Sequence, residues 1–253
     1  MEDQIILIDK PAGISSFGVV AKVRGRLKSE FGHKIKVGHT DTLDPFATGL
    51  LILLTGKMTK KSNEFLKLDK IYEATLKLGY TSTTGDPEGE IQEFYQTNTA
   101  RLPQEYPNEG LEESVGGYDR DRKSAPPVTT GGRDSVSEKP SLDILKTILD
   151  GFVGKITQTP PRFSAIKING QRAYKLARKG QDFEIPSREV EIYSIEVLEY
   201  NYPILKIRTH VSSGTYIRTL AEDIGRSLGT GAYLIALRRT RIGNYDIKNA
   251  VML

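Results

Sequence analysis

Apolar and polar residues alternate in three stretches of this chain, and this alternation limits the folds that are open to it. The stretches are residues 70–82, 189–201 and 203–214. Such alternation is typical of strands that bury one face. Asn201 to Pro203 suits a turn that would join the last two stretches as antiparallel neighbours. We therefore expect a largely antiparallel sheet.

Helical spacing of apolar residues predicts five helices after a short apolar strand near the N-terminus. Ser15 or Ser16 is expected to cap the first helix. The predicted helices cover residues 17–32, 55–68, 142–156, 215–229 and 232–243. Helices and strands mix without a regular βαβ order. The predicted fold class is therefore α+β, with a mixed, largely antiparallel sheet flanked by helices.

Residues 97–140 differ in composition from the rest of the chain. They contain five Pro and five Gly but no Ile, Phe or Met. Such a segment cannot bury enough apolar surface to offset the entropy lost on ordering it. We interpret it as a mobile insertion in a single domain that spans residues 1–253. A linker between two domains is the alternative.

The composition excludes several kinds of chemistry. The 253 residues include no cysteine, and the three histidines, at positions 33, 39 and 210, are scattered. Disulfides and thiolate chemistry are therefore excluded, and no metal site is expected. No apolar run reaches transmembrane length, and the N-terminus lacks a signal-peptide pattern. We expect a cytoplasmic protein without a membrane partner.

Basic residues outnumber acidic residues in two regions. Residues 155–188 contain eight Lys or Arg against two acids, and residues 201–253 contain eight against three. A local basic excess favours a polyanionic partner, because Lys and Arg that neutralise phosphates release counterions. A solvated charged surface is the alternative interpretation.

Asp44 follows Leu43 and stands just before the apolar run at residues 49–54. An Asp before Pro usually forms a turn or a helix cap. Leu43 and Phe46 should nevertheless draw this carboxylate toward an apolar wall, where an unpaired charge is costly. A cationic partner is therefore expected. Arg218 is a candidate, although the sequence alone does not bring the two residues together.

Five ordered stretches resemble the sequence pattern of the TruB family of tRNA pseudouridine synthases. The stretch that contains Asp44, GHTDTLDPFATGLLIL, resembles the family's Gly-His-Thr, Thr-Leu-Asp-Pro and Ala-Thr-Gly pattern. The other four are LIDKPAGISS, DKIYEATLKLGYTSTTGDPEGE, QTPPRFSAIKINGQRAYKLARKG and VSSGTYIRTLAEDIGRSLGTGAYLIALRRTRIG. They cover most of the chain outside residues 97–140, and together they are far more specific than any one of them.

The resemblance implies the pseudouridine synthase fold and an isomerisation without a cofactor. The uridine at position 55 in the T-loop of tRNA would flip from its stack, and its uracil would turn so that C5 replaces N1 on C1′. Asp44 matches the family's catalytic carboxylate, acting as nucleophile or as the base that takes a ribose proton. Tyr72 would stack on the base and help to remove the C5 proton. Arg218 would pair with Asp44 and keep it ionised.

The resemblance also implies binding residues. Tyr216 and Leu237 would wall the base pocket, although Leu237 alone would be interpreted as core. His39 would contact or replace the flipped nucleotide in the RNA stack. Asp86 would support the active site or the RNA backbone, with a surface turn as its alternative. Residues 161–188 would grip the T-arm through its phosphates, with Arg162, Lys167, Arg172, Lys175 and Arg178 as candidates.

The chain departs from the family pattern at three places. Asp41 stands where Gly is usual. A positive φ would be tolerated better by Asp than by most residues, and the added charge would weaken RNA binding. The insertion at 97–140 is longer than usual. No C-terminal PUA domain, which family members often carry, is expected.

Two other functions stay open at this point. One is a chaperone that grips the T-arm and helps tRNA to fold without chemistry; the match at Asp44, Tyr72 and Arg218 disfavours it. The other is a guide-RNA-dependent relative that modifies ribosomal RNA, and the expected lack of a PUA domain disfavours that one. We therefore expect a monomer that acts on tRNA without a guide RNA.

Overall fold

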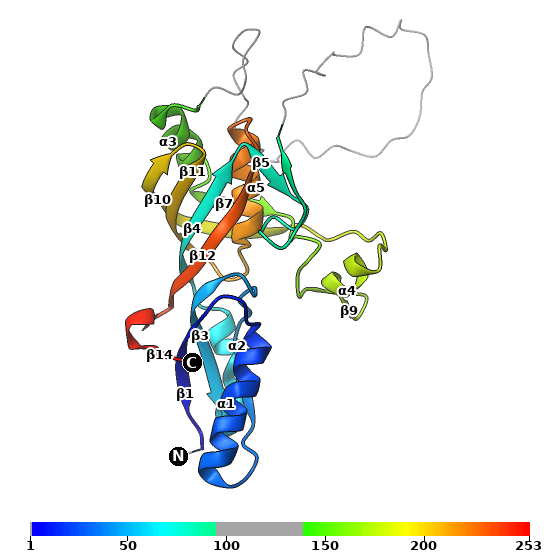
Figure 1. The fold of residues 1–253 in the computed structure, drawn as a ribbon, viewed down its shortest axis with the longest axis vertical. Coiled ribbons are helices and arrows are strands. Elements are labelled where there is room, and N and C mark those ends of the chain that lie inside the picture. The colour runs from blue at the N-terminus through cyan, green and yellow to red at the C-terminus, as the bar shows by residue number, and fades with distance from the viewer. Residues whose placement is uncertain (1, 95–138) are drawn as a thin grey trace, which may run out of the picture.

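A computed structural model describes residues 2–94 and 139–253. Its centre is a mixed sheet of ten strands that runs along the molecule (Figure 1). The strands are, in sheet order, β14 (Val251–Met252), β1 (Ile5–Lys10), β3 (Thr48–Thr55), β12 (Ala232–Ile242), β4 (Lys70–Leu78), β11 (Ile204–Val211), β10 (Arg188–Asn201) and β7 (Gly154–Gln158), with β2 (Val37–His39) on β3 and β13 (Tyr245–Asp246) on β12. Only the pairs β1–β14 and β3–β12 are parallel. The predicted α+β class with a largely antiparallel sheet is confirmed.

Short helices and two small hairpins surround this sheet. The helices are α1 (Ser16–Phe31), α2 (Ser62–Leu66), α3 (Leu142–Asp150), α4 (Ala173–Arg178) and α5 (Ile217–Ser227), with 3₁₀ turns η1 (Gly56–Lys61) and η2 (Ile247–Asn249). One hairpin pairs β5 (Tyr80–Ser82) with β6 (Ile91–Glu93), and the other pairs β8 (Lys167–Ile168) with β9 (Gln171–Arg172). Across these described ranges, no helix is long and apolar enough to cross a membrane.

The alternating stretches form strands as predicted. Strand β4 buries every second residue, from Lys70 to Leu78. Strands β10 and β11 pair as antiparallel neighbours on either side of the predicted turn, with Asn201 opposite Ile204. Helix α1 begins as expected, because the Ser15 hydroxyl accepts a hydrogen bond of 3.0 Å from the amide of Gly18.

Three of the predicted helices differ from the structure. Residues 232–243, predicted as a helix, form strand β12, because their backbone pairs with β4 on one side and with β3 on the other. A short apolar run does not distinguish a buried strand from a buried helix. The helix predicted over 142–156 ends at Asp150, and β7 follows it. The helix predicted over 55–68 is the turn η1 followed by the short α2. Most of the predicted insertion at 97–140 lies outside the described residues.

The main core lies between the central strands and the helices α3 and α5. Strand β12 joins the two ends of the sheet, because it pairs with β4 on one side and with β3 on the other. Its pairing with β3 is short and lies at Thr48 and Gly49. A side chain at Gly49 would bring its Cβ within 2.3 Å of the Arg239 carbonyl oxygen. Only glycine therefore allows β3 to approach β12 this closely.

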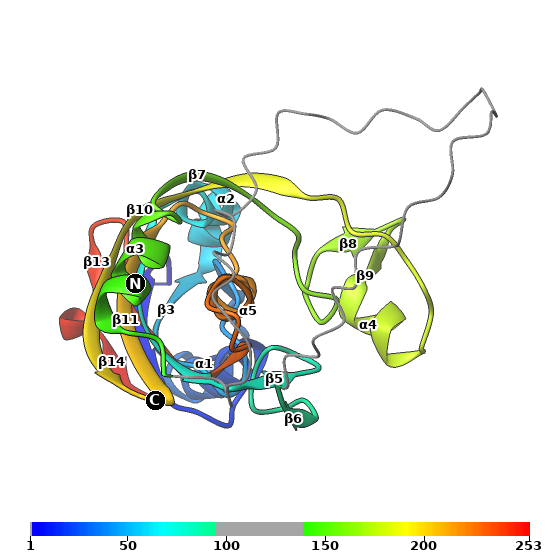
Figure 2. The same ribbon diagram turned by 90° about the horizontal axis from the view of Figure 1, so that it is seen from above.

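The segment that contains β8, β9 and α4 stands apart from the body of the sheet (Figure 2). Its hairpin turns at Asn169 and Gly170, which both have positive φ, as the tight turn of a two-residue hairpin requires. This segment is the central part of the predicted RNA-gripping region at residues 161–188.

Candidate active site

The loop between β2 and β3 holds Asp44 through its two neighbours. On one side, the Ser16 hydroxyl bonds the amide and the carbonyl of Leu43, at 2.9 and 3.0 Å. On the other side, the Lys10 ammonium donates to the carbonyl of Pro45 at 3.2 Å. Neither Ser16 nor Lys10 was predicted as a site residue, although both lie in the stretch LIDKPAGISS. These contacts hold the backbone on both sides of Asp44, and the carbonyl of Asp44 itself accepts a hydrogen bond of 3.1 Å from the amide of Ala47.

Arg218 from the first turn of α5 meets this carboxylate. Its Nε lies 3.1 Å from Oδ2 of Asp44, and its Nη2 lies 3.5 Å from Oδ1. Arg218 is 5% exposed, whereas a third of the Asp44 side chain is open to solvent. The structure thus brings together the two residues that the sequence could not, and it leaves the carboxylate accessible to a substrate.

The remaining donors of Arg218 are also used. Nη1 lies 3.3 Å from Oδ2 of Asp86 and donates to the carbonyl of Thr84 at 3.0 Å, and Nη2 donates to the carbonyl of Phe163 at 2.9 Å. Asp86 is buried and accepts a further hydrogen bond from the Thr84 hydroxyl. Asp86 is therefore no surface turn, because it supports the guanidinium that faces Asp44. An arginine with every donor satisfied has a fixed orientation.

Burial and charge act in opposite directions on Asp44. Burial raises its pKa above the ordinary value of 3.8, the Arg218 guanidinium lowers it, and the negative charge of Asp86 raises it again. Lys10, which has no exposed surface, has its pKa lowered from 10.5 to about 8 by burial, while the charge of Asp44 opposes that shift. The site is thus a largely buried cluster of charges, in which the pKa of each group depends on its neighbours.

The predicted pocket residues Tyr72 and Leu237 lie on adjacent strands. Both are 7% exposed and both belong to the main core cluster, together with Leu43 from the Asp44 loop. Burial raises the pKa of Tyr72 above 10, and the positive charge of Arg239 on β12 lowers it. The Tyr72 hydroxyl is therefore protonated near neutral pH.

Asp41 stands where the family pattern has Gly, but its backbone does not need the conformational freedom of glycine. Among the described non-glycine residues only Asn169 has a positive φ, so Asp41 adopts an ordinary backbone conformation. Its carboxylate lies 3.0 Å from Nη1 of Arg239 and 3.7 Å from Nζ of Lys70. Sequence analysis missed both cations. The charge of Asp41 is thus compensated inside the protein.

His39 ends strand β2, just before the Asp44 loop, and Tyr216 stands just before the helix that carries Arg218. Nδ1 of His39 lies 3.1 Å from the carbonyl of Asp41, and burial lowers the imidazole pKa below 6.5, so the ring is neutral at pH 7. Tyr216 precedes α5, and the side-chain amide of Gln158 bonds both its N–H and its carbonyl, at 2.9 and 3.1 Å. The guanidinium of Arg188 covers the Tyr216 ring at 4.8 Å. Gln158 and Arg188 were not predicted.

The five predicted phosphate-binding cations are all exposed. Arg162 is engaged within its own segment, because it pairs with Asp182 at 3.1 Å and lies over the ring of Phe183. Arg172 bonds the carbonyl of Ala165, and its charge reaches His39, whose pKa it lowers.

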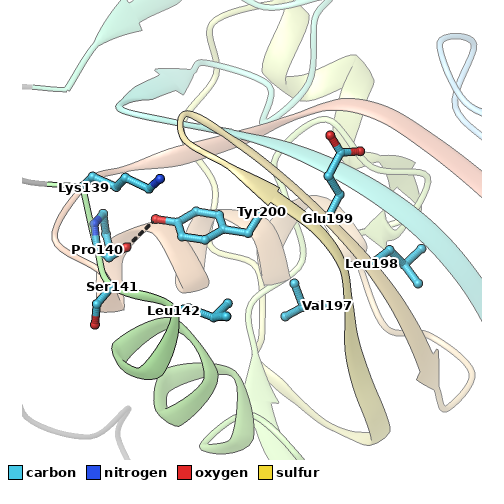
Figure 3. A pocket seen from close by; sticks show the side chains of 8 residues that line it. All are labelled: Lys139, Pro140, Ser141, Leu142, Val197, Leu198, Glu199 and Tyr200. Atoms are coloured by element: carbon cyan, nitrogen blue, oxygen red, sulfur yellow. Dashed lines mark hydrogen bonds between the residues drawn. The ribbon is translucent and has the colours of Figure 1, made fainter.

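Two cavities lie outside this site. One is bounded by the start of α3 and by β10, where the Tyr200 hydroxyl donates to the carbonyl of Pro140 at 2.7 Å (Figure 3). The other, of about 470 Å³, is mainly polar, and Thr84, Phe163 and Glu222 are among its lining residues. Within the part of the chain that the structure describes, no group of three or more His, Asp or Glu side chains could hold a metal ion.

The mixed sheet carries an accessible Asp that pairs with a buried Arg, and its fold is that of the pseudouridine synthases. The fold is similar to that of a chain in the crystal structure of a Cbf5–Nop10–Gar1 complex, with a TM-score of 0.61 and 25% identity; the match covers 100% of this chain and 52% of that one. An archaeal box H/ACA sRNP Nop10–Cbf5 complex gives a TM-score of 0.59 at 23% identity. The chain spans about half the length of these chains.

The family follows from two sequence matches. The N-terminal domain of the TruB family pseudouridylate synthases matches residues 28–131 and 128–217, and the C-terminal domain described for tRNA pseudouridylate synthase B matches residues 218–253. The chain belongs to the TruB family of pseudouridylate synthases, and it is therefore an isomerase.

Relatives in this family are similar along most of the chain. The tRNA pseudouridine synthase B of Parabacteroides distasonis is 41% identical over 245 residues, which cover 96% of this chain and 87% of the relative. That of Phocaeicola vulgatus is 39% identical over 251 residues, which cover 99% and 90%. The resemblance seen in the five motifs is thus confirmed at the level of the family.

Proposed function

We propose that this enzyme converts the uridine at position 55 in the T-loop of tRNA to pseudouridine. The observation that carries the proposal is the ion pair of 3.1 Å between Asp44, whose side chain is partly exposed, and the buried Arg218. The names of the similar relatives, which are tRNA pseudouridine synthases, support tRNA as the substrate. The reaction is an isomerisation, in which substrate and product contain the same atoms, so it needs no cofactor to supply or accept a group.

In this proposal Asp44 acts on the ribose of a uridine that has left the RNA stack. It attacks C1′ as a nucleophile or takes a ribose proton as a base, and both roles require the ionised carboxylate. Arg218 keeps Asp44 ionised against the effect of burial and holds it toward the pocket. The N1–C1′ bond breaks, the C5–C1′ bond forms, C5 loses a proton and N1 gains one.

The pocket walls would receive the flipped uracil. Tyr72 would stack on the base and assist the departure of the C5 proton, while Leu237 and Tyr216 close the apolar sides. Both Tyr72 and Leu237 come from rigid central strands of the sheet, which suits residues that must hold a base in one geometry. The base contacts recover the few kcal/mol that unstacking costs.

The RNA around the flipped nucleotide would lie against the projecting segment at residues 161–188. Lys167, Arg172, Lys175 and Arg178 are exposed cations suited to phosphates, and Arg162 supports the segment from within. The neutral ring of His39 would stack where the uridine has left. We propose further that the enzyme acts as a cytoplasmic monomer on tRNA without a guide RNA.

Release of tritium from tRNA that carries [5-³H]uridine tests this proposal. Wild type should release tritium and place pseudouridine in the T-loop. Asp44→Asn should bind tRNA with nearly unchanged affinity and release none, because its side chain cannot carry the required charge. Turnover by Asp44→Asn near the wild-type rate would remove Asp44 from its role. Tight binding by both proteins without any release would instead favour a tRNA-folding chaperone.

A further inference from the structure

Arg239 on β12 is a large buried cation that the proposed reaction does not use. It has no exposed surface. Its Nε donates to the carbonyl of Leu50 at 2.8 Å and its Nη1 to Oδ2 of Asp41 at 3.0 Å. Its Nη2 is buried and, within residues 2–94 and 139–253, has no hydrogen-bond partner. Buried donors are rarely left unpaired in folded proteins, so this atom requires an explanation.

Asp41 is the carboxylate that compensates this cation. The same Oδ2 that accepts from Arg239 also lies 3.7 Å from Nζ of Lys70, which is 3% exposed. Two nearly inaccessible cations thus share one carboxylate. Its other oxygen, Oδ1, accepts a hydrogen bond of 2.9 Å from the amide of Thr42, so that Asp41 is fixed to the loop that carries Asp44.

Tyr72 is the neighbour of Arg239 across the sheet. The Cα atoms of the two residues are partners in the antiparallel pair β4–β12, and directly opposite residues in such a pair point to the same face. Lys70, two residues earlier on β4, lies on that face as well. Besides burial, which raises the pKa of the Tyr72 hydroxyl, the charge of Arg239 and its approach as a hydrogen-bond donor both lower this pKa, whereas the charge of Asp41 raises it.

We propose that Asp41 is a positioning residue: it holds Arg239 so that Nη2 donates to the Tyr72 hydroxyl oxygen when the flipped base packs on the tyrosine ring. This inference rests on the proposed role of Tyr72. The hydroxyl is thereby turned toward C5 of the base, and the unpaired donor gains its partner.

If Asp41 had only a structural role, it would hold β12 against the loop at residues 40–47, and its effect on the reaction rate would not depend on Tyr72. A double-mutant cycle separates the two roles. Asp41→Asn keeps the shape of the side chain but removes its charge, and Tyr72→Phe removes the hydroxyl. The readouts are the single-turnover rate of tritium release with excess enzyme, the Kd for tRNA and the melting temperature.

We expect Tyr72→Phe to slow release about 100-fold, as loss of a proton-transfer group does, and Asp41→Asn to slow it about tenfold. The double variant should be no slower than Tyr72→Phe alone, because Asp41 would act only through the missing hydroxyl. The Kd for tRNA should stay within about twofold of wild type in all three. Asp41→Gly serves as a second substitution should Asp41→Asn fold poorly.

Asp9→Asn is the matched control. Asp9 holds Arg238, the residue next to Arg239 on β12, at 2.6 and 3.1 Å, so this variant also breaks a carboxylate–arginine pair on the same strand. Whatever its effect on the rate, that effect should be equal with and without the Tyr72 hydroxyl.

Three results would overturn the inference. The first is that Asp41→Asn slows tritium release by the same factor with and without the Tyr72 hydroxyl. The second is that Asp41→Asn does not slow release at all, and the third is that Tyr72→Phe keeps the wild-type rate. These results leave the proposed function intact provided that wild type modifies the T-loop. Absence of release by wild type would overturn the proposed function itself, and this inference with it.

Discussion

Replacement of Arg218 by lysine keeps the positive charge but removes the planar guanidinium, whose donors contact several acceptors in the site. Arg218 contacts two carboxylates, at 3.1 and 3.3 Å, and two carbonyls, at 3.0 and 2.9 Å. A lysine has three donors on one nitrogen and cannot reach four acceptors that surround a guanidinium. At least two bonds that involve a charged group should be lost, at about 1.5–3 kcal/mol each. We therefore expect the free energy of unfolding to fall by about 3–6 kcal/mol.

The same change should reduce catalysis separately from stability. Asp44 loses the partner that orients it, and a displacement of about 1 Å at a catalytic group can cost about 100-fold in rate. Urea unfolding gives the stability, and single-turnover tritium release at a temperature where the variant is folded gives the rate. Arg226→Lys, on the same helix but with an exposed guanidinium that pairs with Asp223, is the control. An Arg218→Lys enzyme that loses less than about 1 kcal/mol and keeps its rate would refute this reasoning.

Two further predictions concern pH and salt. Because burial raises the pKa of Asp44, the rate should fall on acidification at a pH above 3.8. The folded state also binds this proton more tightly than the unfolded state, so the free energy of unfolding decreases as pH rises through the folded pKa. Asp44→Asn should therefore unfold at a higher urea concentration than wild type at pH 7, and equal unfolding midpoints would contradict this direction of the pKa shift. Arg172→Gln and Lys175→Gln should each lower the slope of log Kd for tRNA against log salt by about 0.7, whereas Lys155→Gln, which removes a cation paired with Glu189 outside the segment, should leave it unchanged; equal slopes in all three would exclude the segment from the interface.

The sequence predicted the parts of this protein that depend on local pattern. Strand β4 and the cap of α1 follow from alternation and from the Ser15 side chain, and both are present. Strand β12 was predicted as a helix, because its place between β3 and β4 depends on partners more than 150 residues away in the chain.

The candidate site shows the same limit. The ordered motifs singled out Asp44 and Arg218, and their pairing appears in the structure. Lys10 and Arg239 were missed, because a basic residue in an amphipathic stretch gives no sign that its side chain will be fully buried. Asp41 was noticed only as a departure from a family pattern. Its two cationic partners lie on different strands, and only the fold places them together.

Strand β12 also bears on how the protein is made. It carries Leu237 and Arg239, and it is the strand that links β3 beside the Asp44 loop to β4 with Tyr72. On the ribosome, synthesis proceeds from the N-terminus, so Asp44 emerges long before its surroundings do. The pocket cannot close around a base until β12, which begins more than 150 residues after β4 ends, has been synthesised. Nascent chains of this enzyme should therefore be unable to modify RNA, whatever basic segments they already expose.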